Sequence, residues 1–122
     1  MSAERFVNGS LTLELRDEGP DVVVEWIGRS IARTPGSFVL PILMRAIEIA
    51  QKQKKRAVFD FRTLEYLNSS TITPVVRVLD HARRSSAQLT VRYNNDLKWQ
   101  ALAFSALFLF GTADGRVAIQ GN

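Results

Sequence analysis

The side chains best suited to chemistry in this sequence are three consecutive hydroxyls, Ser69, Ser70 and Thr71. They lie in the stretch DFRTLEYLNSSTITPVV, residues 60–76, between a short apolar run and an apolar helical stripe. This order places them at the N-terminus of a predicted helix, where side-chain oxygens cap free backbone N–H groups. The alternative role is reversible phosphorylation, because the N–H groups and the helix dipole there tolerate the roughly −1.5 to −2 charges of a phosphate. From the residue types alone, both roles stay open.

Signatures of an enzyme are missing from the rest of the chain. It has no cysteine, which excludes a disulfide scaffold, a thiolate metal site and a thiol nucleophile. Its one histidine, His81, lies on the polar face of its predicted helix and is too little for a zinc site. The GxGxxG, GxxxxGK[ST] and GxSxG motifs do not occur, and the acidic residues are scattered. We therefore expect no catalysis, no metal and no cofactor.

The positive charge of the chain is modest. Sixteen basic residues against 12 acidic ones give a formal net charge of +4. The cluster Lys52 to Arg56 follows a predicted helix end, where cations complement the dipole, and Arg77, Arg83 and Arg84 lie mostly on an exposed helical face. No predicted strand carries exposed aromatic residues between its cations, as a base-stacking surface would. We expect no nucleic-acid binding.

The elements that must position the hydroxyls follow from the apolar periodicity. Apolar and polar residues alternate in the predicted strands, and apolar residues recur at helical spacing in the predicted helices. The stretch Asp17 to Asp21 is rich in turn residues. The predicted order is β-β-α-β-α-β-α-β, an α/β fold with a mixed, mostly parallel sheet and an opening hairpin. The predicted strands centre on 11–16, 22–27, 57–61, 89–93 and 116–120, the helices on 39–50, 70–82 and 97–110, and a loop spans Arg62 to Asn68.

The sequence also resembles a known family. The element order, together with a stretch of the type D-[FL]-x-x-[LV]-x-[FY]-[ML]-[DN]-S-S, is similar to the STAS domain of bacterial anti-sigma factor antagonists. The resemblance covers about residues 11–120 and implies a single domain over residues 1–122. It implies phosphorylation at Ser69, with Ser70 or Thr71 as the fallback. Asn68 and Thr71 stand where the family usually has Asp and Gly, and EYLNSST also resembles a divergent STAS-like branch with a YFN-[ST]-S-S motif.

What the resemblance implies is a non-enzymatic protein that switches partners. The unphosphorylated form would bind an anti-sigma factor or kinase of histidine-kinase-like ATPase fold, and this kinase would then modify Ser69 and release the complex. A Ser/Thr phosphatase would reset the switch. The expected contact surface comprises the loop before the second helix, the start of that helix and its flanking residues: Arg62, Leu64, Tyr66, Asn68, Ser69, Ser70, Thr71, Arg77 and Asp80.

Two other roles fit the same family. STAS proteins also serve as small cytoplasmic subunits of membrane transporters, and the divergent branch regulates surface attachment, and hence biofilms, through cyclic-dinucleotide signalling.

The segment Leu97 to Phe110 is apolar nearly all the way round, so it is either a well-buried helix or a surface for a partner or a homodimer.

The location of the protein is inferred from what the sequence lacks. The first ten residues have no apolar core of a secretory signal. The longest apolar run, residues 101–110, is well short of the roughly 20 residues that cross a bilayer. We expect a cytoplasmic protein without membrane insertion.

Overall fold

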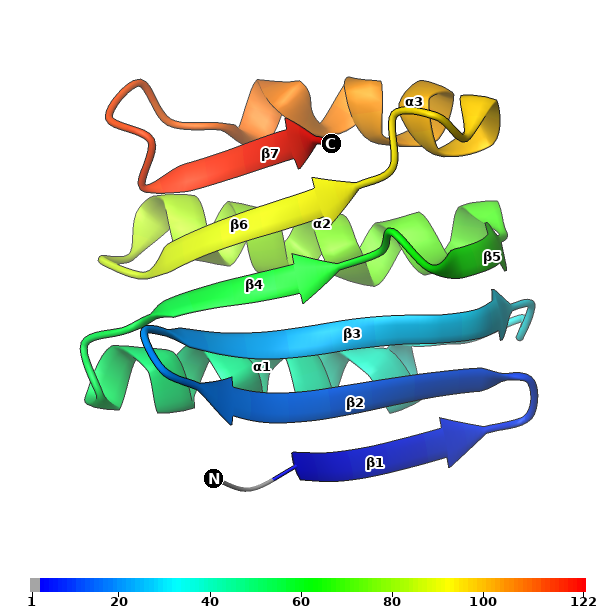
Figure 1. Cartoon of the computed structure of the whole chain (residues 1–122), viewed down its shortest axis with the longest axis horizontal. Helices are drawn as coiled ribbons and strands as arrows, with labels where there is room; N and C mark the ends of the chain where they lie inside the picture. Colours follow the sequence, from blue (N-terminus) through cyan, green and yellow to red (C-terminus); the bar gives the residue numbers. More distant parts are fainter. Residues whose placement is uncertain (1–2) are drawn as a thin grey trace.

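A computed structural model describes residues 3–122 of the chain, which form seven strands, three α-helices and one 3-10 helix. The strands pair in a single sheet, and the helices pack against it (Figure 1). In chain order the elements are β1 (Ala3–Asn8), β2 (Leu11–Glu18), β3 (Asp21–Ser30), α1 (Gly36–Lys52), β4 (Arg56–Asp60), β5 (Leu64–Leu67), α2 (Ser69–Arg84), β6 (Gln88–Tyr93), α3 (Lys98–Ser105), the 3-10 helix η1 (Ala106–Phe110) and β7 (Val117–Gly121).

The sheet has the order β1-β2-β3-β4-β6-β7, and β5 pairs with the second half of β3. The first two pairings are antiparallel, and the other four are parallel. The prediction of a mostly parallel sheet is wrong. The sheet is more evenly mixed, because β1 adds a second antiparallel pairing to the predicted one between β2 and β3. The two antiparallel ladders, β1 with β2 and β2 with β3, are also the longest in the sheet.

The predicted α/β class, mixed sheet and single small domain are confirmed, but two strands were not predicted. One is β1, which extends the opening hairpin by an edge strand. The other is β5, which occupies residues expected to be a loop. Strand β3 is ten residues long, so β4 covers only Asp21–Glu25 and leaves its end free to pair with β5.

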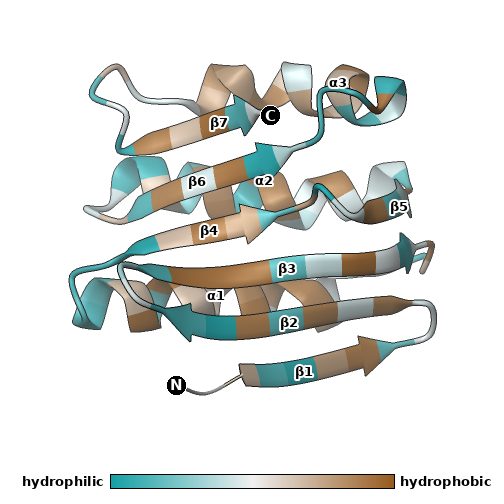
Figure 2. Ribbon diagram, in the orientation of Figure 1, coloured by the Kyte–Doolittle hydropathy of each residue, from teal (hydrophilic) through white to brown (hydrophobic). Residues whose placement is uncertain are grey.

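One face of the sheet carries the core. In Figure 1 the helices lie behind the strands, and the other face of the sheet points toward the viewer. Alternate strand residues such as Leu13, Val24 and Phe59 are fully buried under the helices, whereas their neighbours Glu14 and Glu25 are partly exposed on the open face. The strands in Figure 2 accordingly change between brown and teal along their length. Helix α1 buries the five residues predicted for its apolar stripe: Val39, Leu43, Ala46, Ile47 and Ala50.

Both long helices contain a proline beyond the first turn. Pro41 is the sixth residue of α1, and Pro74 is the sixth residue of α2. We expected the regular part of the second helix to begin no earlier than about Ser70, so that its first turn would absorb the missing N–H of Pro74. The helix instead begins at Ser69, and Pro74 cannot donate to the carbonyl of Ser70 four residues earlier.

Candidate functional site

The hydroxyl cluster lies at the start of α2, where Asn68 is the N-cap residue. Its Oδ1 accepts hydrogen bonds from the backbone N of Thr71, at 3.1 Å, and from Thr71 Oγ1, at 2.7 Å. Its Nδ2 donates to the carbonyl of Ala32 at 2.8 Å, and its backbone N donates to the carbonyl of Ser30 at 3.0 Å. Asn68 therefore caps α2 and also holds the segment after β3 against the helix N-terminus.

Thr71 is a structural residue of this cap. It has no exposed surface, and its Oγ1 lies 2.6 Å from the Oγ of Ser30, which is itself buried at the end of β3. The two buried hydroxyls and the partly exposed Asn68 side chain form one hydrogen-bonded network. Phosphorylation of Thr71, the last of the three predicted acceptors, would require the start of the helix to open.

Ser69 and Ser70 are exposed, and they are the first two residues of α2. Within residues 3–122, neither hydroxyl makes a hydrogen bond, since the capping role falls to Asn68. Of the two roles left open for the hydroxyls, capping therefore does not fall to these two serines. A change to either hydroxyl would break no hydrogen bond that the described residues make.

The approach to α2 is held in place by β5 and Gln100. The side chain of Gln100 is fully buried, and its Nε2 donates to the carbonyls of Phe61, at 2.7 Å, and Leu64, at 3.0 Å. Its Oε1 accepts from the backbone N of Asn94 at 2.8 Å. One amide thus ties the connection between β4 and β5 to the loop between β6 and α3.

The residues predicted to flank the hydroxyls divide into buried and exposed ones. Leu64 is 1% exposed, so it belongs to the core and not to the contact surface. Tyr66 is 43% exposed. Its ring lies near Trp99, at 6.5 Å between ring centroids, and near the guanidinium of Arg29, at 5.5 Å from the ring centroid. Arg77 is exposed farther along the face of α2 that begins with Ser70. Asp80, also on α2, pairs with Arg84 at 3.0 Å.

Arg62 is engaged with Asp60 at the end of β4. The guanidinium donates from Nε to Oδ1 at 3.0 Å and from Nη2 to Oδ2 at 2.8 Å, and the backbone N of Arg62 also donates to Oδ1. Burial alone would raise the pKa of the Asp60 carboxyl, but these hydrogen bonds outweigh it and hold the pKa below its usual range. The pair fixes the turn that leads into β5.

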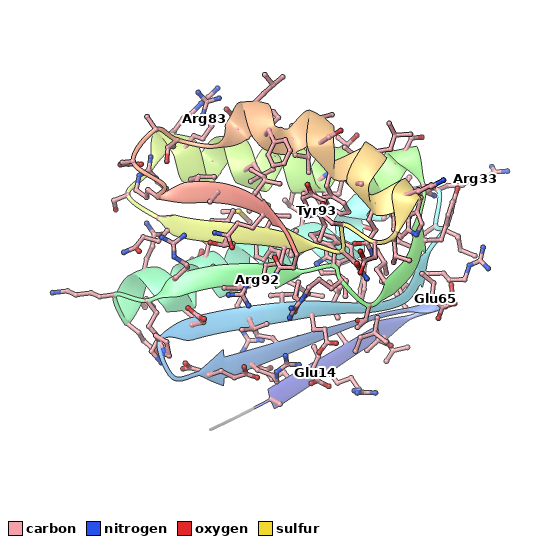
Figure 3. All side chains as sticks on the ribbon, turned by 45° about the horizontal axis from the view of Figure 1, so that its top comes forward. Glu14, Arg33, Glu65, Arg83, Arg92 and Tyr93 are labelled. Carbon is pink, nitrogen blue, oxygen red and sulfur yellow. The ribbon has the colours of Figure 1, made fainter. Side chains whose placement is uncertain are left out.

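The loop after β3 is a part of the site that the sequence did not reveal. It brings the exposed residues Ile31 and Arg33 beside the N-terminus of α2, because Ala32 accepts the bond from Asn68. A cleft of about 190 Å³ lies along this loop, lined by Ile31, Ala32, Pro35 and Phe38 among others. The sequence signal was limited to the Pro35-Gly36 breaker, which marks a loop but says nothing of its neighbours. Figure 3 shows Arg33 and Glu65 at the same end of the molecule, away from Arg83.

The apolar segment Leu97–Phe110 is buried on one face and exposed on the other. Gln100, Phe104 and Leu107 face the interior, whereas Leu102 is 78% exposed and Leu109 is 82% exposed. In the part of the chain that the structure describes, no helix is long and apolar enough to cross a bilayer. The same residues hold no group of three or more His, Cys, Asp or Glu side chains suited to a metal ion.

A comparison of the sequence with protein-family models found no match, and a comparison with curated proteins found none either.

Proposed function

We propose that the protein is a non-enzymatic bacterial signalling protein that switches partners through phosphorylation of Ser69, as its resemblance to anti-sigma factor antagonists implies. The observation that carries this proposal is that different residues at the start of α2 make the helix cap and present exposed hydroxyls. Asn68 and Thr71 make the cap, so Ser69 and Ser70 are exposed hydroxyls with no structural bond, within the chain from residue 3 onward. Ser70 is the second candidate for the same role.

In the proposed switch, the unphosphorylated protein binds a kinase of histidine-kinase-like ATPase fold. The Ser69 Oγ attacks the γ-phosphorus of ATP, its proton passes to a base of the kinase, and ADP leaves. The phosphoprotein then dissociates, and a Ser/Thr phosphatase hydrolyses the ester to restore the hydroxyl. The contact surface comprises the loop after β3, Tyr66, Asn68 and the exposed start of α2.

The surroundings of Ser69 favour an added anion. The first turn of α2 contains no acidic residue, so a phosphate would place the first negative charge at this helix N-terminus. Arg29 and Arg33 are exposed cations on the neighbouring strand and loop. The folded protein can therefore keep its structure while the charge of the contact surface changes by about −2.

Titration calorimetry with the kinase tests the switch. Ser69→Asp, which mimics the charge, should weaken binding at least about tenfold, whereas Ser69→Ala should bind as the unmodified protein does. Thr73→Asp is the matched control, because Thr73 is exposed one turn farther along α2. Equal affinity for Ser69→Asp and the unmodified protein would contradict the proposal. Co-purification with a transporter ATPase, insensitive to Ser69→Ala, would support the transporter role instead.

A further inference from the structure

Two turns of the chain contain an asparagine or aspartate that is followed by glycine. One pair is Asn8–Gly9, between β1 and β2, and the other is Asp114–Gly115, before β7. In such a pair the backbone nitrogen of the glycine can attack the side-chain carbonyl carbon of the residue before it. Glycine favours the attack because it has no Cβ beside that nitrogen and its backbone rotates freely. The reaction in a folded protein then depends on whether the two groups are free.

Both reacting groups of the pair Asn8–Gly9 are free. The two residues are exposed, and among residues 3–122 neither the Asn8 side chain nor the N–H of Gly9 makes a hydrogen bond. No atom lies within 4 Å of the place that a Cβ on Gly9 would take, so the space beside it is open. Strand β1 is the edge of the sheet, and Asn8 pairs only with Leu11 at the end of the hairpin (Figure 1). Opening of this last pair lets Asn8 leave its extended conformation at small cost.

The second pair, Asp114–Gly115, is closed by hydrogen bonds. The Oδ1 of Asp114 accepts from Thr112 Oγ1 at 2.6 Å and from the backbone N of Arg116 at 3.0 Å. The backbone N of Gly115, which is the atom that would attack, donates to the carbonyl of Thr112 at 3.1 Å. The bond from Thr112 also lowers the pKa of the Asp114 carboxyl, so the group stays in the charged form that a nucleophile does not attack.

The three other asparagines before the C-terminal residue are held in place too. The amide of Asn68 caps α2. The Oδ1 of Asn94 accepts from the backbone N two residues later at 2.9 Å. The side chain of Asn95 packs against Gly121, where an added Cβ would lie 2.3 Å from Oδ1. Within residues 3–121, Asn8 is therefore the asparagine whose side chain is held by neither a hydrogen bond nor such a close contact.

We propose that Asn8 is a site of spontaneous deamidation in the folded protein. The backbone N of Gly9 bonds to Cγ of Asn8, the side-chain nitrogen leaves with the displaced proton as ammonia, and a succinimide ring closes. Water then adds to one of the two ring carbonyls and opens the ring. One carbonyl gives aspartate, and the other gives isoaspartate, in which the main chain runs through the side-chain carbon. Nothing is oxidised or reduced, and both products carry one additional negative charge.

Isoaspartate should disturb this turn, because the turn is fitted closely to β3. The backbone N of Arg29 donates to the carbonyl of Ser10 at 3.0 Å, and Ser10 Oγ donates to the carbonyl of Arg29 at 3.0 Å. Gly28 permits this approach, since a Cβ there would lie 2.2 Å from the Ser10 oxygen. An additional backbone carbon at position 8 shifts Ser10 relative to both partners. We expect the isoaspartate form to unfold at a lower urea concentration than Asn8→Asp, which carries the same charge on an unchanged backbone.

Peptide mapping by mass spectrometry, on the whole protein kept folded in warm neutral buffer, follows the reaction at each position. Asp114→Asn is the matched control, because it places a second asparagine–glycine pair in the closed turn. In this folded variant, position 8 should lose its amide at least about tenfold faster than position 114, since the closed turn must open before it reacts. In urea both turns are lost, and the two rates should become equal.

Two results would overturn the proposal. One is an Asn8 that stays intact in the folded protein while the same residue reacts in urea. The other is an equal rate at positions 8 and 114 in folded Asp114→Asn. Asn8→Gln should remove the modification and keep the fold, because the side chain is exposed and makes no hydrogen bond within residues 3–122. Ser69 takes no part in the reaction, so this proposal and the phosphorylation of Ser69 can fail separately.

Discussion

At the scale of single residues, the amide of Asn68 explains how the serines beside it stay free. The amide accepts from Thr71 and donates to Ala32, two functions that a carboxylate could not combine. The Thr71 hydroxyl joins Asn68 to Ser30. Asn68, Thr71 and Ser30 thus form one hydrogen-bonded unit.

Removal of this cap should destabilise the protein far more than removal of either serine hydroxyl. We expect Asn68→Ala to lower the free energy of unfolding by about 1 to 2 kcal/mol, the usual cost of losing an N-cap. Ser69→Ala and Ser70→Ala should change it by no more than about 0.5 kcal/mol, as for ordinary surface substitutions. Urea denaturation gives all three values. A Ser69→Ala loss as large as that of Asn68→Ala would mean that Ser69 has a structural role.

A negative charge at position 69 should stabilise the fold. Ser69→Glu places a carboxylate in the first turn of α2, where it interacts favourably with the helix dipole, by about 0.3 to 1 kcal/mol at low salt. Ser86→Glu puts the same charge just beyond the other end of the helix, where we expect no gain. Urea denaturation at low and high salt checks both variants. A lower stability for Ser69→Glu would show that the site resists an anion.

At the scale of elements, the strongly periodic segments could be predicted from the sequence, and the two weak strands could not. In β1, Glu4 and Phe6 share one side and Arg5 and Val7 share the other, so neither face is apolar enough to stand out. In β5, buried Leu64 and Leu67 enclose two exposed residues, and the pairing with β3 skips Glu65, which breaks the two-residue period. Both strands form because each pairs with the edge of a longer strand, β1 with β2 and β5 with β3.

In the candidate site, too, local features could be predicted from the sequence and long-range contacts could not. The position of Ser69 to Thr71 at the start of a helix followed from the local pattern. The bond between Ser30 and Thr71 joins residues 41 positions apart, and nothing in the local sequence marks it. The burial of Leu64 likewise depends on the long strand β3, which provides the pairing edge for β5. Local patterns therefore located the hydroxyls but did not separate the free ones from the structural one.

The Gln100 side chain should prove essential for positioning β5 and α2. Gln100→Leu keeps a similar volume but leaves the carbonyls of Phe61 and Leu64 and the N–H of Asn94 without their partner. We expect a loss of about 1 to 3 kcal/mol in the free energy of unfolding. Gln120→Leu, on the exposed side of β7, is the matched control and should be near neutral. If Gln100→Leu and Gln120→Leu lowered the free energy of unfolding equally in thermal denaturation, the buried amide of Gln100 would have no special stabilising role.

At the scale of the whole molecule, the protein has one packed face and one charged face. The open side of the sheet carries Arg16, which pairs with Glu14 at 2.7 Å and Glu25 at 2.9 Å and also contacts Glu18. Hydrogen bonds from Arg16 and then Arg5 lower the pKa of Glu14, and Asp60 has a lowered pKa because its bonds to Arg62 outweigh its burial. Carboxylates paired in this way link stability to pH.

Acid should therefore destabilise the fold. Because the folded-state pKa values of Glu14 and Asp60 lie below those of the unfolded chain, the unfolded chain binds more protons as the pH falls. The stabilisation is complete above the unfolded values, about 4, and is lost as the pH drops through the folded ones. Urea denaturation at about pH 7 and about pH 3 should show the loss. Asp60→Asn should reduce this dependence.

The central claim concerns phosphate on Ser69, and site-resolved mass spectrometry tests it most directly. The whole protein is incubated with ATP and a kinase of histidine-kinase-like ATPase fold from the same cell, and fragmentation then locates the modification. The account predicts one phosphate on Ser69 that is lost in Ser69→Ala, with none on the buried Thr71. The absence of phosphate from both Ser69 and Ser70 in the unmodified sequence would contradict it.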